Sequence, residues 1–251
     1  MTVPYTGSTG ASVVRGTVGL AVSTPSQPLP VPAVVSRIAG GLPVAAVWVN
    51  ELGGVTFAVG DPPTAFVKTY PDGVAHLLDD EAVRLAWARR HVTVPEVLAS
   101  GRGWLHTAAL PGRSAVDARW TGRPETAARA IGAGLRALHD SLPVADCPFG
   151  APSWIGEGAP PPARLVVCHG DACAPNTLMA DDGSFAGHVD LGDLGVADLW
   201  ADLAIATMSL DWNYPGGEWE AVLLAAYGVA PDAERIAFYR QRWNDEPARP
   251  G

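Results

Sequence analysis

The sequence almost lacks lysine. Of its 17 basic residues, every one except Lys68 is an arginine. A general bias toward arginine explains the other positions, so the single remaining lysine is the one whose presence needs a reason. Lys68 lies within the apolar stretch 65–70, where a buried ammonium requires an anionic partner. This pattern favours a binding or catalytic role over a solvated lysine on an edge strand.

Other absences narrow the class of protein. The three cysteines, Cys147, Cys168 and Cys173, follow no disulfide or metal-ligand spacing, which indicates a reducing compartment. No apolar run reaches membrane-spanning length, because Arg37 interrupts the best candidate. The N-terminus lacks the charged and then apolar pattern of a signal peptide. We therefore expect a cytoplasmic protein with no membrane partner.

The charge balance points to the kind of partner. The formal net charge is −9, which argues against a nucleic-acid partner and is compatible with a polycationic small molecule. Hydrophobic residues make up 48% of the chain and charged residues 17%, which excludes a disordered chain. With 251 residues, the chain can form one large domain or two small ones.

The most informative stretch is residues 165–195. A short apolar strand is expected at 165–168, followed by a turn at Asp171 and a hairpin whose strands cover 177–180 and 185–189. Such a hairpin brings Asn176 and Asp190 together at its open end. Asp171 enters the same place from the preceding loop, so two carboxylates and one amide oxygen converge.

Phosphoryl transfer requires such a set of groups. The enzyme must orient an acceptor hydroxyl, hold magnesium on the phosphate oxygens and neutralise charge. We assign Asp171 to the acceptor hydroxyl and its proton, and Asn176 and Asp190 to magnesium. His169 is expected to support the loop, and Gly192 is expected to allow a sharp turn after Asp190.

These residues carry a resemblance to a known family. The segment 169–176, HGDACAPN, resembles the catalytic loop of the aminoglycoside phosphotransferases, particularly the 3′ and 3″ types, which are relatives of protein kinases. The segment 189–192, VDLG, with Gly195 and Asp198 resembles their metal-binding segment. Two unrelated acidic loops are the alternative interpretation. Because Asp171 and Asp190 are 19 positions apart with a hairpin between them, the kinase interpretation is favoured.

The resemblance implies a fold and a cofactor. It implies an α+β, two-lobed, protein-kinase-like fold with an N-terminal antiparallel sheet plus one helix. The C-terminal lobe is mostly helical and carries the catalytic hairpin. Residues 1–110 would form the nucleotide-binding lobe, with a weakly ordered extension at 1–28, and residues 111–251 would form the catalytic and substrate-binding lobe. ATP or GTP would bind between the lobes with Mg²⁺.

Several residues of the first lobe are candidates for nucleotide binding. Strands at 44–50 and 55–59 are joined by a turn with Gly53 and Gly54, which the resemblance places over the phosphates. A simple hairpin turn is an equally good interpretation of the two glycines.

The lysine and the hinge complete the expected nucleotide site. The resemblance makes Lys68 the phosphate-contacting lysine, with Glu81 at the start of a helix over 77–91 as its partner and Asp80 as the competing candidate. Thr107 and Ala109 lie where the resemblance places the hinge between lobes, whose backbone groups would bind adenine.

The acceptor side departs from the family pattern. Only 15 residues separate Phe149 from Leu165, whereas the typical 3′ and 3″ enzymes carry a longer helical insert that forms part of the aminoglycoside cleft. Five acidic residues are candidates for binding substrate ammonium groups: Asp193, Asp211, Glu218, Asp245 and Glu246. Solvated acids at helix ends are the alternative for each.

Three functions remain open from the sequence. The first is ATP-dependent O-phosphorylation of an aminoglycoside antibiotic. The second keeps the chemistry but uses another small hydroxylated metabolite as acceptor, because the segment at 150–164 is short. The third is a nucleotide-binding module without turnover, which the joint presence of the four residues Lys68, Asp171, Asn176 and Asp190 disfavours.

Overall fold

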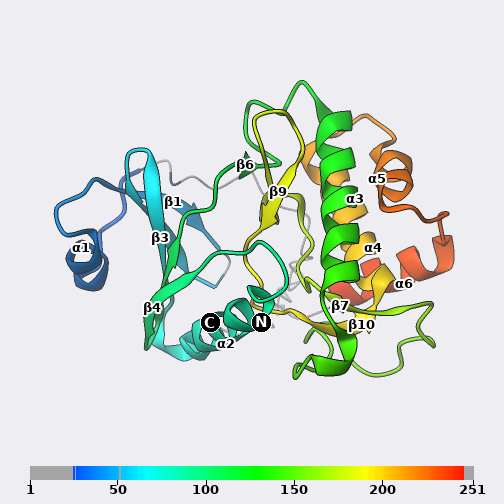
Figure 1. Cartoon of the computed structure of the whole chain (residues 1–251), viewed down its shortest axis with the longest axis horizontal. Helices are drawn as coiled ribbons and strands as arrows, with labels where there is room; N and C mark the ends of the chain where they lie inside the picture. Colours follow the sequence, from blue (N-terminus) through cyan, green and yellow to red (C-terminus); the bar gives the residue numbers. More distant parts are fainter. Residues whose placement is uncertain (1–24, 26, 51, 246–251) are drawn as a thin grey trace, which may run out of the picture.

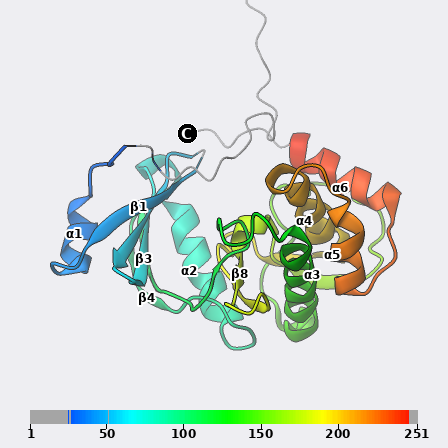
Figure 2. The same ribbon diagram turned by 90° about the horizontal axis from the view of Figure 1, so that it is seen from above.

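The computed structural model describes residue 25 and residues 27–50 and 52–245. Nearly all of the extension expected at 1–28 therefore lies outside the described residues, as does Glu246. Two groups of elements make up the described part, a sheet with two helices and a bundle of helices, with a hairpin between them (Figures 1 and 2). This is the α+β, two-lobed architecture that the sequence predicts.

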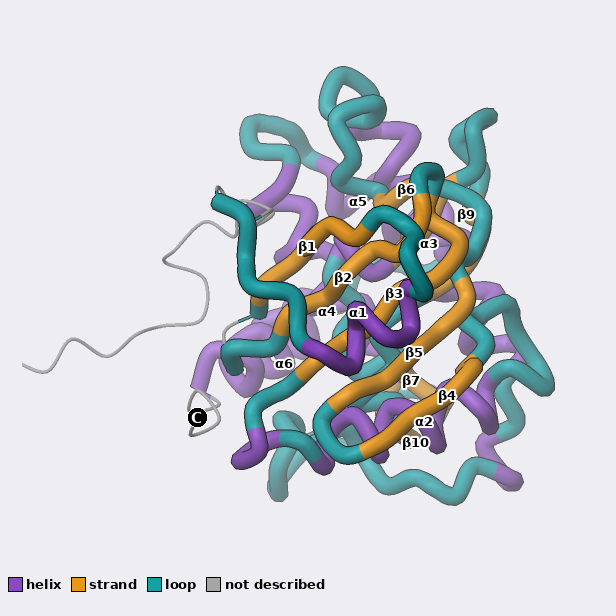
Figure 3. The backbone as a smooth tube through the Cα atoms, turned by 90° about the vertical axis from the view of Figure 1, so that its left-hand side faces the viewer, coloured by secondary structure: helices purple, strands orange, loops and turns teal. Residues whose placement is uncertain are grey.

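The first lobe is built on one antiparallel sheet with the strand order β1-β2-β3-β5-β4 (Figure 3). Its strands are β1 (Val44–Val49), β2 (Val55–Gly60), β3 (Pro63–Thr69), β4 (Val97–Gly101) and β5 (Trp104–Ala108). Strand β4 begins after Pro95, which has no N–H to donate to a neighbouring strand.

Helices cover both faces of this sheet. Helix α1 (Ala33–Ala39) packs on Phe57 and Val67, and helix α2 (His76–Ala88) packs on the opposite face. Side chains alternate along a strand, so Lys68 points away from α1 and toward α2. The alternation thereby decides which helix can supply a partner for the lysine.

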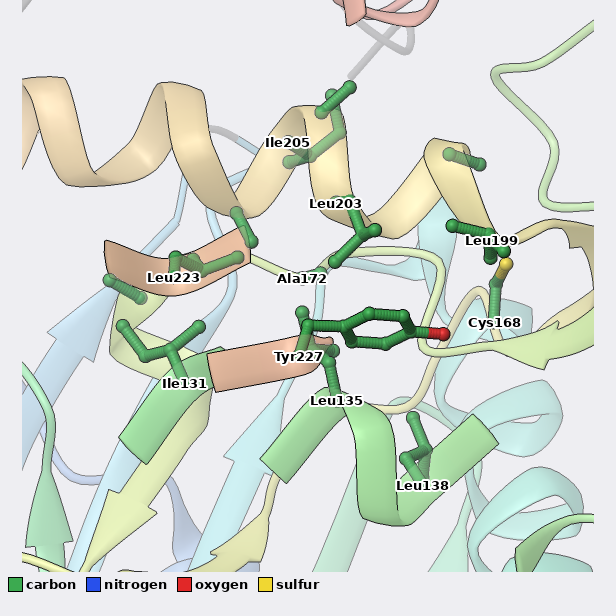
Figure 4. Close-up of a cluster of buried hydrophobic side chains, with 14 of the residues drawn as sticks. Ile131, Leu135, Leu138, Cys168, Ala172, Leu199, Leu203, Ile205, Leu223 and Tyr227 are labelled. Atoms are coloured by element: carbon green, nitrogen blue, oxygen red, sulfur yellow. The ribbon is translucent and has the colours of Figure 1, made fainter. Parts of the chain in front are cut away.

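The second lobe is mostly helical. Helices α3 (Pro124–Ser141), α4 (Leu199–Asn213), α5 (Trp219–Tyr227) and α6 (Ala233–Asp245) form it. Figure 4 shows leucines of α3 and α4 facing one another across the ring of Tyr227 from α5. Helix α4 is buried along twelve consecutive residues, 199–210, which anchors the carboxylate of Asp202 firmly in the core.

Short strands position the loops between the lobes. The hairpin β8 (Thr177–Met179) and β9 (Phe185–His188) pairs with β6 (Arg113–Ser114), and β7 (Leu165–Cys168) pairs with β10 (Gly195–Asp198). Strand β10 was not predicted, because its pairing with β7 is a long-range contact without a local signal. Together these strands hold loops 169–176 and 189–194 side by side.

The described residues include no helix with both the length and the apolar composition needed to cross a lipid bilayer.

Candidate active site

Lys68 lies at the centre of a three-residue ionic cluster. Its Nζ is 2.7 Å and 3.0 Å from the two carboxylate oxygens of Glu81 on α2. The same Nζ is 2.8 Å from Oδ1 of Asp190, which follows β9 in the other lobe. One ammonium therefore joins the sheet, helix α2 and the loop after the hairpin. Asp80, the competing partner, instead faces Arg84 at 3.9 Å.

The cluster perturbs the protonation of all three groups. Burial alone would lower the pKa of Lys68, but the carboxylates of Asp190 and Glu81 raise it above its ordinary value. Burial raises the pKa of Glu81 to about 7, an effect that Lys68 opposes and Asp190 reinforces. Desolvation would raise the pKa of Asp190, but Lys68 lowers it below the ordinary value. Two carboxylates thus share one positive charge.

Loop 169–176 is anchored by the buried carboxylate of Asp202. Its Oδ2 accepts the backbone N–H of His169 at 2.6 Å, and its Oδ1 accepts that of Gly170 at 3.0 Å. His139 lies 2.9 Å from the same carboxylate, and its other ring nitrogen lies 2.8 Å from the hydroxyl of Tyr227. Burial alone would raise the pKa of Asp202, but the hydrogen bond with His139 lowers it.

His169 joins the catalytic loop to the loop that carries Asp190. Its Nδ1 accepts the N–H of Asp171 at 3.3 Å, and its Nε2 donates to the carbonyl of Val189 at 3.0 Å. These partners require the neutral ring with the proton on Nε2. His169 is buried, so it contributes to the position of Asp171 and does not reach the cleft. The expected supporting role therefore agrees with its contacts.

The backbone turns sharply after Asp190, as we expected: Gly192 lies in a turn in which the N–H of Leu194 donates to the carbonyl of Leu191 at 3.2 Å. The φ of Asp190 is 62°, which is the one positive value at a non-glycine residue among the described residues. Strained backbone of this kind concentrates at functional sites. Glycine is instead required at Gly170, where φ is +85° and an added Cβ would lie 2.1 Å from the carbonyl oxygen of Asp193.

Two cavities meet at this cluster. The larger one, of about 610 Å³, lies under the sheet and is lined by Lys68, Thr107 and Leu110. The second opens toward α4 and α6 and is lined by Asp171 and Trp212. Asn176 and Asp190 line both cavities. A cavity of about 610 Å³ lies within the range of small-molecule sites. A group held in one cavity can therefore meet a group held in the other at Asn176 and Asp190.

The residues at this junction fit a divalent cation. The amide Nδ2 of Asn176 donates to the carbonyl of Asp171 at 3.0 Å, which directs Oδ1 of the same amide to the other side. Asp190 contacts Lys68 through Oδ1, and its side chain is 40% exposed toward the cavities. An amide oxygen and a carboxylate oxygen are the hard ligands that Mg²⁺ prefers.

The two glycines of the first hairpin do not reach either cavity. Asn50 accepts the N–H of Gly54 on its side chain at 2.7 Å and the N–H of Gly53 on its carbonyl at 3.1 Å. An added Cβ on Gly54 would lie 2.3 Å from the ring of Tyr70. The structure therefore favours the simple turn over the expected phosphate contact at these residues.

The hinge differs by one residue from our expectation. Thr107 lines the larger cavity, but Ala109 does not. The N–H of Ala109 donates to the carbonyl of Thr64 at 3.0 Å, on the side of β3. Its neighbours Ala108 and Leu110 line the cavity. Alternation along the chain thus turns Ala109 away from the larger cavity.

Of the acidic candidates for substrate binding, only Asp193 lines the second cavity among the described residues. Asp211 points to Arg240, 4.0 Å away. Glu218 and Asp245 are exposed and line neither cavity. Glu246 lies outside the described residues. Among the four described candidates, position therefore supports a substrate contact for Asp193 and not for the other three.

The second cavity has aromatic walls that the sequence did not reveal. Trp48, Tyr70, Trp212 and Trp243 line it. These residues come from β1, the end of β3, α4 and α6, so no spacing in the sequence relates them.

Comparisons with known proteins agree with this geometry. A sequence profile described as the phosphotransferase enzyme family matches residues 34–155 and 151–239. An aminoglycoside 3′-phosphotransferase of Streptomyces fradiae is 33% identical over 68% of this chain and 80% of that protein. A streptomycin 3″-kinase of Streptomyces griseus is 32% identical over 77% of this chain and 89% of its own length.

Solved structures show the same arrangement. An aminoglycoside 3′-phosphotransferase of type VIII superposes with a TM-score of 0.68 at 28% identity, over 82% of this chain and 93% of the other. An aminoglycoside phosphotransferase of the 3″ type from Streptomyces rimosus superposes with a TM-score of 0.65 at 27% identity, over 82% and 94%.

Proposed function

The chain belongs to the phosphotransferase enzyme family that includes the aminoglycoside 3′- and 3″-phosphotransferases, and from this premise we propose that it transfers the γ-phosphoryl group of ATP to a hydroxyl of an aminoglycoside. The observation that carries the proposal is the ion pair between Lys68 and Asp190 at the junction of two cavities. One cavity suits a nucleotide and the other suits its acceptor. Residues 1–110 would bind the nucleotide, and residues 111–251 the acceptor.

Each residue at the junction has a distinct task. Lys68, held by Glu81, would contact the phosphate oxygens of the nucleotide. Asp171 would orient the acceptor hydroxyl and receive its proton while the new O–P bond forms and the bond to ADP breaks. Backbone groups of Ala108 and Leu110, which line the nucleotide cavity, would contact the adenine or guanine base.

Asn176 and Asp190 would hold Mg²⁺, as their oxygen atoms fit that ion. When bound, the ion would neutralise negative charge on the phosphate oxygens. Lys68 already contacts one oxygen of Asp190, which keeps that carboxylate ionised and ready to bind a cation. The pKa shift of Asp190 therefore supports this role.

The acceptor cavity favours a cationic molecule. It combines the carboxylate of Asp193 with the aromatic rings of Trp48, Trp212 and Trp243. Aromatic faces and carboxylates both attract ammonium and guanidinium groups. Relatives named for aminoglycosides and for streptomycin identify a substrate class with this chemistry.

A direct assay tests the proposal. We expect the purified chain with ATP and Mg²⁺ to form a product 80 Da heavier than the drug, about the mass of one added phosphoryl group. Streptomycin and kanamycin represent the guanidinium and ammonium types, and Asp171→Ala provides the inactive control. Expression in a sensitive bacterium should raise the inhibitory concentration of the same drug. If no phosphorylated drug forms in the first assay and the inhibitory concentration does not rise in the second, the aminoglycoside assignment is refuted.

A second acceptor class follows from the walls of the cavity. Only one of the described acidic candidates lines it, while four aromatic residues do. Another small hydroxylated metabolite with one cationic group would also satisfy this lining. ADP release across a panel of hydroxylated amines would separate the two classes, because the metabolite alternative requires turnover without drug phosphorylation.

A further inference from the structure

The short connection between α3 and β7 lies against the catalytic loop. Within it, Ser153 donates to Oδ2 of Asp193 at 3.0 Å, and the indole Nε1 of Trp154 donates to the carbonyl of Gly170 at 2.7 Å. Trp154 is only 4% exposed, so water does not compete for this bond. The connection therefore contacts both loops that carry the acidic residues of the site.

The bond from Trp154 acts on the peptide unit that precedes Asp171. The carbonyl of this unit belongs to Gly170 and accepts the indole N–H, and its N–H belongs to Asp171 and donates to His169. Both ends of the peptide are thus held. Asp202 holds only the two preceding N–H groups. Because the peptide unit is planar, the bonds from Trp154 and to His169 at its two ends together fix the direction of the Gly170 carbonyl.

Because residue 170 is a glycine, the Gly170–Asp171 peptide needs these hydrogen bonds to hold its orientation. Gly170 has a φ of +85°, a region that glycine enters as readily as its mirror image. A peptide that follows such a residue can rotate at low cost unless hydrogen bonds hold it. Rotation would carry the backbone of Asp171, and with it the carboxylate, away from the acceptor hydroxyl.

The ring of Trp154 is itself held by the wall of the acceptor cavity. It makes edge-to-face contacts with Trp243 at 5.2 Å and with Tyr239 at 6.3 Å between ring centroids. Trp243 lines the acceptor cavity. Helix α6 thereby fixes Trp154, and Trp154 fixes the catalytic loop.

We propose that Trp154 is a positioning residue for phosphoryl transfer, acting through the Gly170–Asp171 peptide. This inference rests on the proposed function, because it takes Asp171 as the group that receives the hydroxyl proton. Trp154 lines neither cavity, and it contacts Trp243 in the wall of the acceptor cavity. Its loss should therefore lower kcat and leave the KM for ATP unchanged.

The full-length chain allows a matched test. Trp154→Phe removes the N–H and keeps an aromatic ring, and we expect kcat to fall about tenfold with the KM for ATP within about twofold. Trp120→Phe is the control, because Trp120 is fully buried and its indole nitrogen has no hydrogen-bond partner among the described residues. We expect the control to retain wild-type kcat despite a similar decrease in thermal midpoint.

A sulfur isostere separates the hydrogen bond from packing. Benzothienylalanine introduced at position 154 preserves the shape of the ring and lacks the N–H, so it should reproduce the loss of kcat with little change in thermal stability. Wild-type kcat in both position-154 variants would overturn this inference alone, as would an equal loss of kcat in Trp120→Phe. A wild-type chain that phosphorylates no acceptor would overturn the proposed function as well.

Discussion

The nucleotide side and the acceptor side of the site are built in different ways. On the nucleotide side, Lys68 contacts two carboxylates within 3.0 Å, and much of the remaining wall is one face of the sheet. On the acceptor side, aromatic rings from separate parts of the chain line the cavity together with carboxylates that include Asp193. The nucleotide side depends on a few ionic contacts of defined geometry. The acceptor side depends on how elements that are distant in the sequence pack together.

This difference has a physical origin. Every nucleoside triphosphate presents the same phosphates, so the groups that bind them are restricted to particular residue types at particular places. Acceptors differ in shape and charge, so many combinations of side chains can form their wall. Substitutions on the nucleotide side should therefore affect every acceptor equally, whereas those on the acceptor side should discriminate among acceptors.

The largest expected effect is at Asp171, which lines the acceptor cavity. Asp171→Ala should lower kcat about 10³-fold, because it removes the group that orients the hydroxyl and accepts its proton. Nucleotide affinity, measured by calorimetry, should remain within about twofold. Asp182→Ala, at an exposed turn of the hairpin, is the control and should retain activity. Unchanged turnover in Asp171→Ala would refute the assigned role.

A change at Lys68 tests whether the nucleotide side is independent of the acceptor. Lys68→Met should lower kcat/KM for ATP about 10²-fold by removing a preorganised positive charge from the phosphates. The factor should be the same for every acceptor. The variant also leaves Glu81 and Asp190 without their shared cation. Adding Glu81→Gln should therefore restore part of the lost thermal stability, and strict additivity of the two changes would contradict the shared ion pair.

The raised pKa of Glu81 predicts a pH dependence of stability. Burial raises this pKa from 4.5 to about 7, so the folded chain binds a proton more tightly than the unfolded chain. The stabilisation from this proton is complete below pH 4.5 and is lost as the pH rises to about 7. The free energy of unfolding without nucleotide should therefore decline over this interval, by at most about 1.4 kcal/mol per pH unit.

Glu81→Gln is the comparison for this measurement. The variant lacks the titrating carboxyl, so its urea-unfolding free energy should change less with pH over the same interval. Groups that the two chains share contribute equally to both profiles and cancel in the difference. Parallel pH profiles for the two chains would show that Glu81 stays ionised throughout, with Lys68 as its dominant neighbour.

The same difference explains how far the sequence could predict the structure. The meeting of Asn176 and Asp190 was predictable because hairpins follow local rules, whereas the roles of Lys68 and Glu81 came from the family resemblance. The hydrogen bond of Trp154 to loop 169–176 and the place of Trp212 in the cavity wall were not predictable, because both arise from tertiary packing. The positive φ of Asp190 was not predicted for a related reason: the fold imposes this backbone conformation, and no local sequence signal marks it.

The smallest expected effect separates two acids that look equivalent in the sequence. Asp193 lines the acceptor cavity, whereas Asp211 contacts Arg240. Asp193→Asn should raise the KM for a cationic acceptor about fivefold, as expected for one partly solvated charge pair. The KM for ATP should not change. Asp211→Asn should leave both KM values within about twofold.

Added salt sharpens this comparison. Screening weakens the attraction between Asp193 and a cationic acceptor, so the KM of the wild-type chain should rise with salt and that of Asp193→Asn should rise less. Asp211→Asn should follow the wild type. If Asp211→Asn instead loses acceptor affinity and Asp193→Asn does not, the acceptor lies on the other side of α4, and the aromatic cavity is not its binding site.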